Sequence, residues 1–494
     1  MSGWLGIHFG GLRTKLGVTA QGVVMPLNLP PNITSIPSTV AFDASQGSFC
    51  IGEEAENLRN LDPKNAVWNL PGLLFPPKGD QFLQAVLADS CITLEVDQNQ
   101  GAAVNFEGEL YEVAELVKFF FAEVKDLVEG SLNASFEKAA ITVPGSAGAS
   151  HRAAVLEAAE SAGFTEVRLI SEPAAAAAGA YHQNAQGDAE IGVANFGYTC
   201  SSLALVTKGD GVFEQLMGVS GPGLWETDLA VAGVLADALS GNDKIDVSEG
   251  SPNFDRLWAA AASLRVQSST SGKTEITVEN LELKDGSRSA AKLSVTTENI
   301  KDLLSESLEW LDGAGEKLNA IGKADTVIAV HEEPMPEGQA VVKAKNAFGV
   351  NPDLTPSPSD SVVLGAAVLA GIKQKDFPDL LIMESAGYAY GIEVAEKGFH
   401  PVLKANNTIP LNASQTFTTS TDNQKEVAVN VYEGLGDTID ENTYIGSFTL
   451  SGIPEAPAGS AQVKLTFEID ANGIFSVKGM ETESGTELTV TKQT

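Results

Sequence analysis

The feature that most constrains the fold is a repeat within residues 1–378. A short apolar strand, a glycine-containing turn and further strands begin near Leu5, with Gly10-Gly11 in the turn. The pattern returns near Ile191, with Gly197-Tyr198-Thr199 in the turn, and amphipathic helical segments follow each copy. The repeat predicts two similar α/β lobes. Two lobes that face each other leave a cleft, where we expect a ligand site.

Three helical segments between the strands differ in what they can pack against. Residues 112–127 carry one apolar stripe at the helical period, which is typical of a helix covering a sheet. The alanine run Ala174–Ala178 and the small-residue segment 362–372 have short side chains. We expect the alanine run to lie very close to its neighbours, and we interpret residues 362–372 as a helix of small residues.

From Tyr390 onward the apolar period becomes two, and turn signals such as Asp470-Ala471-Asn472-Gly473 separate the runs. The pattern predicts an all-β sandwich over residues 390–494. The candidate strands are 390–394, 415–419, 426–432, 445–450, 463–469 and 474–479.

Asp379, Leu380, Leu381 and Ile382 lie where the two periodicities meet, so we interpret residues 379–389 as a linker. An exposed linker is normally polar, and the four apolar residues in a row from Leu380 to Met383 need another explanation. Two interpretations follow from the pattern: a buried edge strand of one domain, or a hydrophobic clasp between the domains.

Composition excludes several classes of partner. The chain has 31 basic and 65 acidic residues, a formal net charge of −34, which argues against direct binding of nucleic acid or of anionic membranes. The three cysteines have neither disulfide nor metal spacing. The first residues lack a signal-peptide pattern, and no apolar run is long enough for a membrane span. We expect a cytoplasmic protein without a metal site.

Several motifs together resemble the heat-shock-70 chaperones along essentially the whole chain. In the second half they include Asp379-Leu380-Leu381-Ile382, Tyr390-Gly391-Ile392-Glu393, Asn406-Asn407-Thr408-Ile409-Pro410, Val431-Tyr432-Glu433-Gly434 and Phe467-Glu468-Ile469-Asp470-Ala471-Asn472-Gly473-Ile474. In the first half they include Pro63-Lys64-Asn65, Ile141-Thr142-Val143-Pro144, Glu172-Pro173 and Gly365-Ala366-Ala367. The resemblance implies a two-lobed actin-like ATPase fold followed by a peptide-binding β sandwich. It also favours the interdomain clasp for residues 380–382.

The resemblance also shows what the cleft lacks. His8 and Asn195 stand where the family has the two aspartates of its hairpins, and Pro71 stands where it has the catalytic lysine. Neutral side chains cannot supply fixed negative charge to hydrated magnesium, and proline has neither charge nor donor. One well-placed electrostatic group contributes about 3–4 kcal/mol to lowering a barrier, so the combined losses predict no turnover. We assign no catalytic residue.

Other cleft positions are altered too. Leu12 replaces a hydroxyl residue, and His331-Glu332 replaces a Gly-Gly pair after the strand 326–330. The vestigial nucleotide-binding positions are Gly10, Gly11, Glu172, Gly197, Gly218, Gly223 and Arg265. Two expectations stay open: ATP is bound without hydrolysis, or the cleft holds no nucleotide.

The peptide site carried over by position is weakened. Ile392, Phe417 and Val427 match the apolar pocket, whereas Ala395 and Ser420 are too small to arch over a peptide. The helical lid of the family is not seen before Thr494. The three apolar residues fit either ordinary sandwich core or weak peptide binding.

Taken together, the resemblance suggests an atypical branch of the family whose members pair with a J-domain protein on the ribosome. We expect a non-hydrolysing co-chaperone or platform that acts on new chains. One alternative is an architectural subunit of a large ciliary or organellar assembly. The other is an ATP-driven peptide-binding chaperone.

Overall fold

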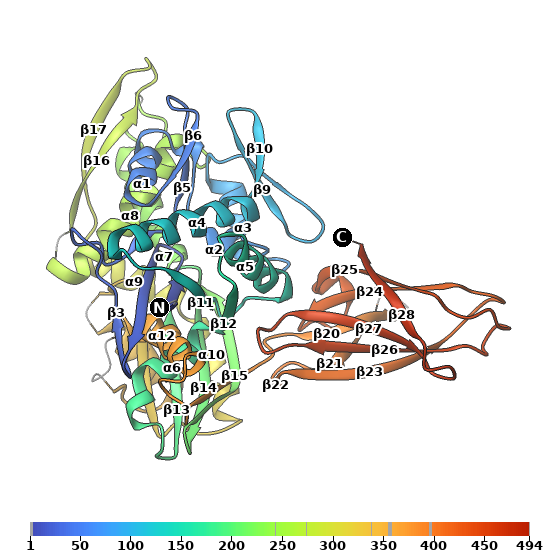
Figure 1. The fold of residues 1–494 in the computed structure, drawn as a ribbon. Coiled ribbons are helices and arrows are strands. Elements are labelled where there is room, and N and C mark those ends of the chain that lie inside the picture. The colour runs from blue at the N-terminus through green and yellow to red at the C-terminus, as the bar shows by residue number, and fades with distance from the viewer. Residues whose placement is uncertain are drawn as a thin grey trace.

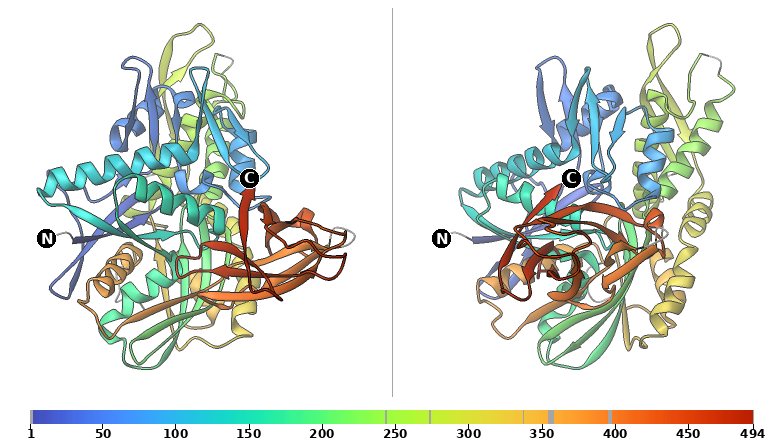
Figure 2. Two further views of the ribbon diagram at one scale, coloured as in Figure 1. Left: turned by 45° about the vertical axis from the view of Figure 1, so that its right-hand side comes forward. Right: turned by 90° about the vertical axis from the view of Figure 1, so that its right-hand side faces the viewer.

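The computed structural model describes residues 3–242, 244–272, 274–336, 338–353, 358–394 and 398–493. Two α/β lobes form one body, and an all-β domain projects from its side (Figure 1). Two further views place the β domain, coloured orange to red, against both lobes (Figure 2).

Lobe I is built on a sheet with the strand order β12-β11-β1-β2-β3. The strands are β1 (Gly3–Phe9), β2 (Arg13–Ala20), β3 (Val23–Pro26), β11 (Phe136–Val143) and β12 (Glu166–Ser171). Helix α4 (Val113–Leu132) buries its apolar stripe, and its Phe121 ring lies 4.9 Å from that of Phe9 on β1. The apolar period therefore predicted this helix correctly. It extends to Leu132 and ends at Asn133, whose φ of 47° is left-handed.

Lobe II repeats this arrangement. Its sheet has the order β18-β13-β14-β15 and continues into β19. The strands are β13 (Ala189–Phe196), β14 (Cys200–Gly209), β15 (Val212–Pro222) and β18 (Thr326–His331). In both lobes an antiparallel three-strand meander is followed by a parallel strand beside its first member. The predicted repeat is present in the structure.

Two helices of small residues cross between the lobes. They are α6 (Glu172–Tyr181) and α12 (Ser361–Lys373). A Cβ on Gly365 would lie 1.9 Å from the carbonyl oxygen of Ala175, and a Cβ on Gly179 would lie 1.9 Å from that of Ser361. Backbone therefore lies against backbone, as the alanine run predicted.

The β domain is an antiparallel sheet with the order β21-β20-β24-β25-β28-β27-β26-β23. Its strands are β20 (Ala389–Val394), β21 (Gly398–Leu403), β23 (Leu411–Thr418), β24 (Glu426–Gly434), β25 (Thr443–Ser451), β26 (Gln462–Ile469), β27 (Phe475–Glu481) and β28 (Glu487–Gln493). Alternate residues of β26 point into the core, which is the predicted period of two. The fold class predicted from the sequence is confirmed, although β21 and β28 were not predicted.

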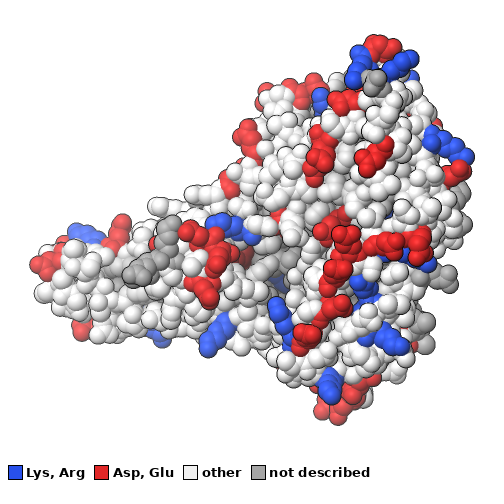
Figure 3. Space-filling model, turned by 180° about the vertical axis from the view of Figure 1, so that it is seen from behind, with Lys and Arg blue, Asp and Glu red and all other residues white. Residues whose placement is uncertain are grey.

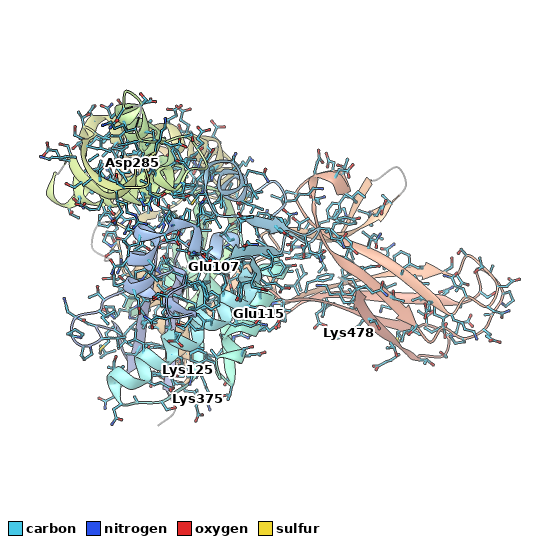
Figure 4. All side chains as sticks on the ribbon, turned by 90° about the horizontal axis from the view of Figure 1, so that it is seen from above. Glu107, Glu115, Lys125, Asp285, Lys375 and Lys478 are labelled. Carbon is cyan, nitrogen blue, oxygen red and sulfur yellow. The ribbon has the colours of Figure 1, made fainter. Side chains whose placement is uncertain are left out.

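The remaining elements complete the two lobes. They are β4 (Ile36–Pro37), β5 (Val40–Asp43), β6 (Ser48–Ile51), α1 (Gly52–Leu61), β7 (Ala66–Val67), α2 (Leu70–Leu73), α3 (Gln81–Asp89), β8 (Leu94–Val96), β9 (Ala102–Phe106), β10 (Glu109–Glu112), α5 (Ala149–Ser161), α7 (Trp225–Leu239), α8 (Pro252–Ser271), β16 (Glu275–Glu282), β17 (Arg288–Ser294), α9 (Thr297–Ser307), α10 (Trp310–Asn319) and α11 (Gln339–Phe348). Seen from above, Asp285 at the β16–β17 turn and Lys478 of the β domain lie on opposite sides of the molecule (Figure 4).

The linker is a strand of lobe II. β19 (Leu381–Ser385) pairs in parallel with β15, with Leu381 opposite Val212 and Ile382 opposite Phe213. Its other edge pairs with β22 (Thr408–Ile409) from the β domain. β19 therefore lies inside a sheet that continues from lobe II to a strand of the β domain.

Acidic residues outnumber basic ones, 65 to 31, and the charged side chains are scattered over the face that Figure 3 shows. From behind, Asp and Glu side chains are spread over the two-lobed body, with Lys and Arg side chains between them (Figure 3). No helix in the described parts of the chain combines the length and apolarity that a bilayer crossing requires.

Candidate functional site: the cleft between the lobes

Both glycine turns reach the same cleft. The β1–β2 turn follows β1 in lobe I, and the β13–β14 turn follows β13 in lobe II. β18 runs parallel to β13, and its final residue His331 lies opposite Phe196, so Glu332 emerges beside the second turn. Ligand sites of open α/β sheets form at such carboxyl ends of strands.

His8, Glu172 and Asn195 meet between the lobes, and all three are buried. His8 Nε2 lies 3.5 Å from Glu172 Oε1, and Asn195 Nδ2 donates a 2.8 Å hydrogen bond to Glu172 Oε2. The two oxygens of the Glu172 carboxylate thus face one nitrogen each, His8 from lobe I and Asn195 from lobe II. Glu172, which begins α6, is satisfied by side chains of the protein itself.

Glu332 occupies the space between the two turns. Its Oε1 accepts hydrogen bonds from the backbone N–H groups of Leu12 at 2.7 Å and Arg13 at 2.9 Å. Its Oε2 accepts one from Tyr198 N at 3.0 Å. The Glu332 side chain thus joins the turn of lobe I to the turn of lobe II.

Gly10 and Gly11 leave room for these contacts. A Cβ on Gly10 would lie 2.6 Å from Glu332 Oε1, and one on Gly11 would lie 2.6 Å from Thr199 Oγ1. Thr199 Oγ1 donates to Asn69 Oδ1 at 2.6 Å, which is another direct contact between the lobes. Side chains of the protein therefore lie against both glycines.

The other predicted positions are distributed differently. Gly197 begins the second turn, and its carbonyl accepts from Leu224 N, the neighbour of Gly223. Gly218 lies within β15 opposite Ala204, outside the turns. Pro71 is buried in the short helix α2.

Arg265 on α8 is fully buried and paired with a carboxylate. Its Nε and Nη2 donate to the two oxygens of Asp228 at 2.7 and 3.1 Å, and its Nη1 donates to the carbonyl of Pro334 at 3.4 Å. Burial raises the pKa of Asp228, and the charge of Arg265 opposes this shift. These bonds direct the guanidinium toward protein acceptors.

A family model described as Hsp70 protein matches residues 4–494. The chain belongs to the Hsp70 family. A chaperone-related function and protein partners such as co-chaperones follow from Hsp70 membership. The Hsp70 fold also implies a magnesium nucleotide in the cleft, and its fit can be tested against the residues present.

A magnesium nucleotide does not fit this arrangement. Magnesium takes oxygen ligands, whereas His8 and Asn195 present nitrogen to Glu172. The N–H groups that would cradle phosphate already bond to Glu332. The described residues also contain no cluster of three His, Cys, Asp or Glu side chains arranged for a metal ion.

The linker residues lie at a buried junction between the domains. Leu380 and Ile382 pack against the core around α6, whereas Leu381 is 49% exposed. Next along the strand, Glu384 Oε1 accepts from Ser171 N at 2.7 Å and from Arg152 Nη2 at 3.4 Å. The strand is therefore fixed to lobe I as well as to lobe II.

The residues predicted to bind peptide lie in the β domain. Ile392 is 6% exposed in its core, and Phe417 and Val427 are partly buried against that core. Ser420 is exposed, and its N–H donates to Gln424 Oε1 at 2.8 Å. Ala395 lies outside the described residues. Peptide binding at these positions stays a prediction.

Sequence reasoning missed three residues of the cleft. Glu332 was noticed only as a lost glycine, and Asn69 and Thr199 were not assigned to contacts between the lobes. The sequence did contain a signal for Glu332. An acidic residue stands where the family has a glycine in the nucleotide cleft, and its carboxylate can occupy the place of a bound anion.

Proposed function

We propose that the chain is a non-hydrolysing Hsp70-type co-chaperone that pairs with a J-domain protein in ribosome-linked folding of new chains. The observation that carries the loss of hydrolysis is the contact of His8 and Asn195 with Glu172. Hydrolysis needs carboxylates that hold the hydrated metal and a lysine on the transferred phosphate. In this chain those places hold a histidine, an asparagine and Pro71.

Without ATP hydrolysis, the protein would act by binding partner proteins on its surface. Lobe I contacts both the β domain and the linker: Glu433 Oε2 of the β domain accepts from Ala149 N at 2.8 Å, and Tyr388 Oη of the linker donates to the carbonyl of Ser146 at 3.1 Å. Packed, hydrogen-bonded interfaces favour a fixed arrangement of domains. A fixed arrangement suits a platform that holds a partner continuously.

Two measurements test the proposal. Phosphate release by the purified full chain with MgATP is expected to equal the buffer background, with and without a J-domain protein. Release that is abolished by Glu172→Ala would overturn the loss of hydrolysis and favour an ATP-driven chaperone.

The partner is tested separately. The chain is expected to co-purify with a J-domain protein and to cosediment with ribosomes only while that partner is present. Stable recovery in a large assembly that contains neither would contradict the proposed role and favour an architectural subunit.

A further inference from the structure

The carboxylate of Glu332 lies where an anion would be bound between the two turns. The residue is 4% exposed, and its carboxylate receives the N–H groups of Leu12, Arg13 and Tyr198. Backbone N–H groups of successive turn residues form a concave anion site, and here two turns converge on one side chain.

The neighbouring charged side chains, Lys15 and Glu333, do not take the place of Glu332 at the three N–H groups. Lys15 Nζ is directed at carbonyl oxygens, donating to Ser359 at 2.8 Å and to the main chain of Glu332 at 3.4 Å, and it lies 3.7 Å from Asp360 Oδ1. The next carboxylate, Glu333, receives none of the three turn N–H groups. The partners of the Glu332 carboxylate are thus fixed backbone dipoles.

We propose that Glu332 is a built-in anionic ligand that holds the two lobes together without nucleotide. In this arrangement the anion is covalently part of lobe II, through β18, while two of its three donors belong to lobe I. Its effective concentration at the site is therefore high, and a free oxyanion must displace it to bind. Removing the carboxylate leaves a vacant site for a small oxyanion such as inorganic phosphate.

Amide hydrogen exchange on the nucleotide-free full chain tests the bonds directly. The amides of Leu12, Arg13 and Tyr198 are expected to be protected in the wild-type chain. A hydrogen bond to a charged group contributes about 1.5–3 kcal/mol. In Glu332→Ala these amides should therefore exchange roughly tenfold to a hundredfold faster.

Inorganic phosphate then serves as the probe. We expect millimolar phosphate to restore protection of the three amides in Glu332→Ala and to raise its unfolding temperature. The wild-type chain and the control variant Glu333→Gln should show no such response. Glu332→Gln keeps the shape of the side chain but removes its charge, so it provides a second variant should Glu332→Ala fold poorly.

Either of two results would overturn the proposal. One is fast exchange of the three amides in the wild-type chain, which needs no variant. The other is a wild-type response to phosphate as large as that of Glu332→Ala or Glu332→Gln, because the carboxylate would then not occupy the site. Both outcomes are independent of any J-domain partner, so they leave the proposed function to its own test.

Discussion

The Asn472 side chain in the β domain bonds to the backbone on both sides of Arg168 in lobe I. Its Oδ1 accepts from Leu169 N at 3.1 Å, and its Nδ2 donates to the carbonyl of Val167 at 3.3 Å. β12 is the edge strand of its sheet, so the amide satisfies groups that a neighbouring strand would otherwise pair. The turn predicted at residues 470–473 is therefore a docking contact.

Asn472→Ala is expected to weaken docking of the β domain by about 1–3 kcal/mol, because both edge groups of β12 lose their partner in a buried contact. Faster amide exchange at Leu169 would report this loss. Asn423→Ala, in an exposed turn of the same domain, is the matched control. Equal exchange in both variants would contradict the docking role.

A charge introduced at Ile382 should disturb docking of the linker strand much more than the same charge at its neighbour Leu381. Ile382 packs against the core around α6, whereas Leu381 is 49% exposed. Burying an unpaired charge is costly, so Ile382→Asp should release the strand and Leu381→Asp should have little effect. Trypsin cleavage after the exposed residues Lys373 and Lys375 measures release. Equal cleavage rates in the two variants would contradict the docked strand.

His8→Asp should destabilise the cleft. The new carboxylate would face the buried Glu172, which would keep Asn195 but lose the nitrogen of His8. Two buried carboxylates side by side repel each other, so we expect a loss of several kcal/mol. Thermal unfolding measures the loss, and His8→Asn, which adds no charge, should lose less. Magnesium chloride should recover part of the loss only in His8→Asp, where two carboxylates meet. Equal losses in the two variants would show that the side chain at position 8 does not face the Glu172 carboxylate.

Stability should fall as the pH drops from about 7 to 4. Burial lowers the pKa of His151 from 6.5 to about 4, and its Nδ1 lies 2.6 Å from the carbonyl of Leu74. The unfolded chain thus binds a proton that the folded chain excludes, which removes about 3 kcal/mol at pH 4. His151→Asn should make this slope shallower without removing it, because burial also lowers the pKa of His331 to about 4. Urea unfolding across the pH range measures the slope. His400→Gln, at an exposed histidine, should not change it.

The sequence was most informative where neighbouring residues determine structure. The stripe of α4, the crossing alanines of α6 and the alternation in β26 were predicted from local periodicity. β28 was not, since only one residue of Glu487–Gln493 is fully buried and its apolar alternation is weak.

The cleft depended on contacts that no local pattern encodes. Glu332 and Leu12 are 320 positions apart, and their contact requires both lobes to be folded and facing. From the sequence came the expectation that His8, Asn195 and Pro71 stand where the family has charged residues. The sequence did not indicate that the carboxylate of Glu332 lies between the two turns and accepts hydrogen bonds from both.

The crossing of α6 and α12 limits how the lobes can move. With Gly365 against Ala175 and Gly179 against Ser361, backbone lies on backbone at two points of the crossing, with no side chain between. Domain closure commonly proceeds by shear, in which packed helices slide, or by rotation at a hinge. Backbone contact leaves little room for sliding, so we expect any opening between the lobes to be a swing about this crossing, in which the outer rim travels furthest.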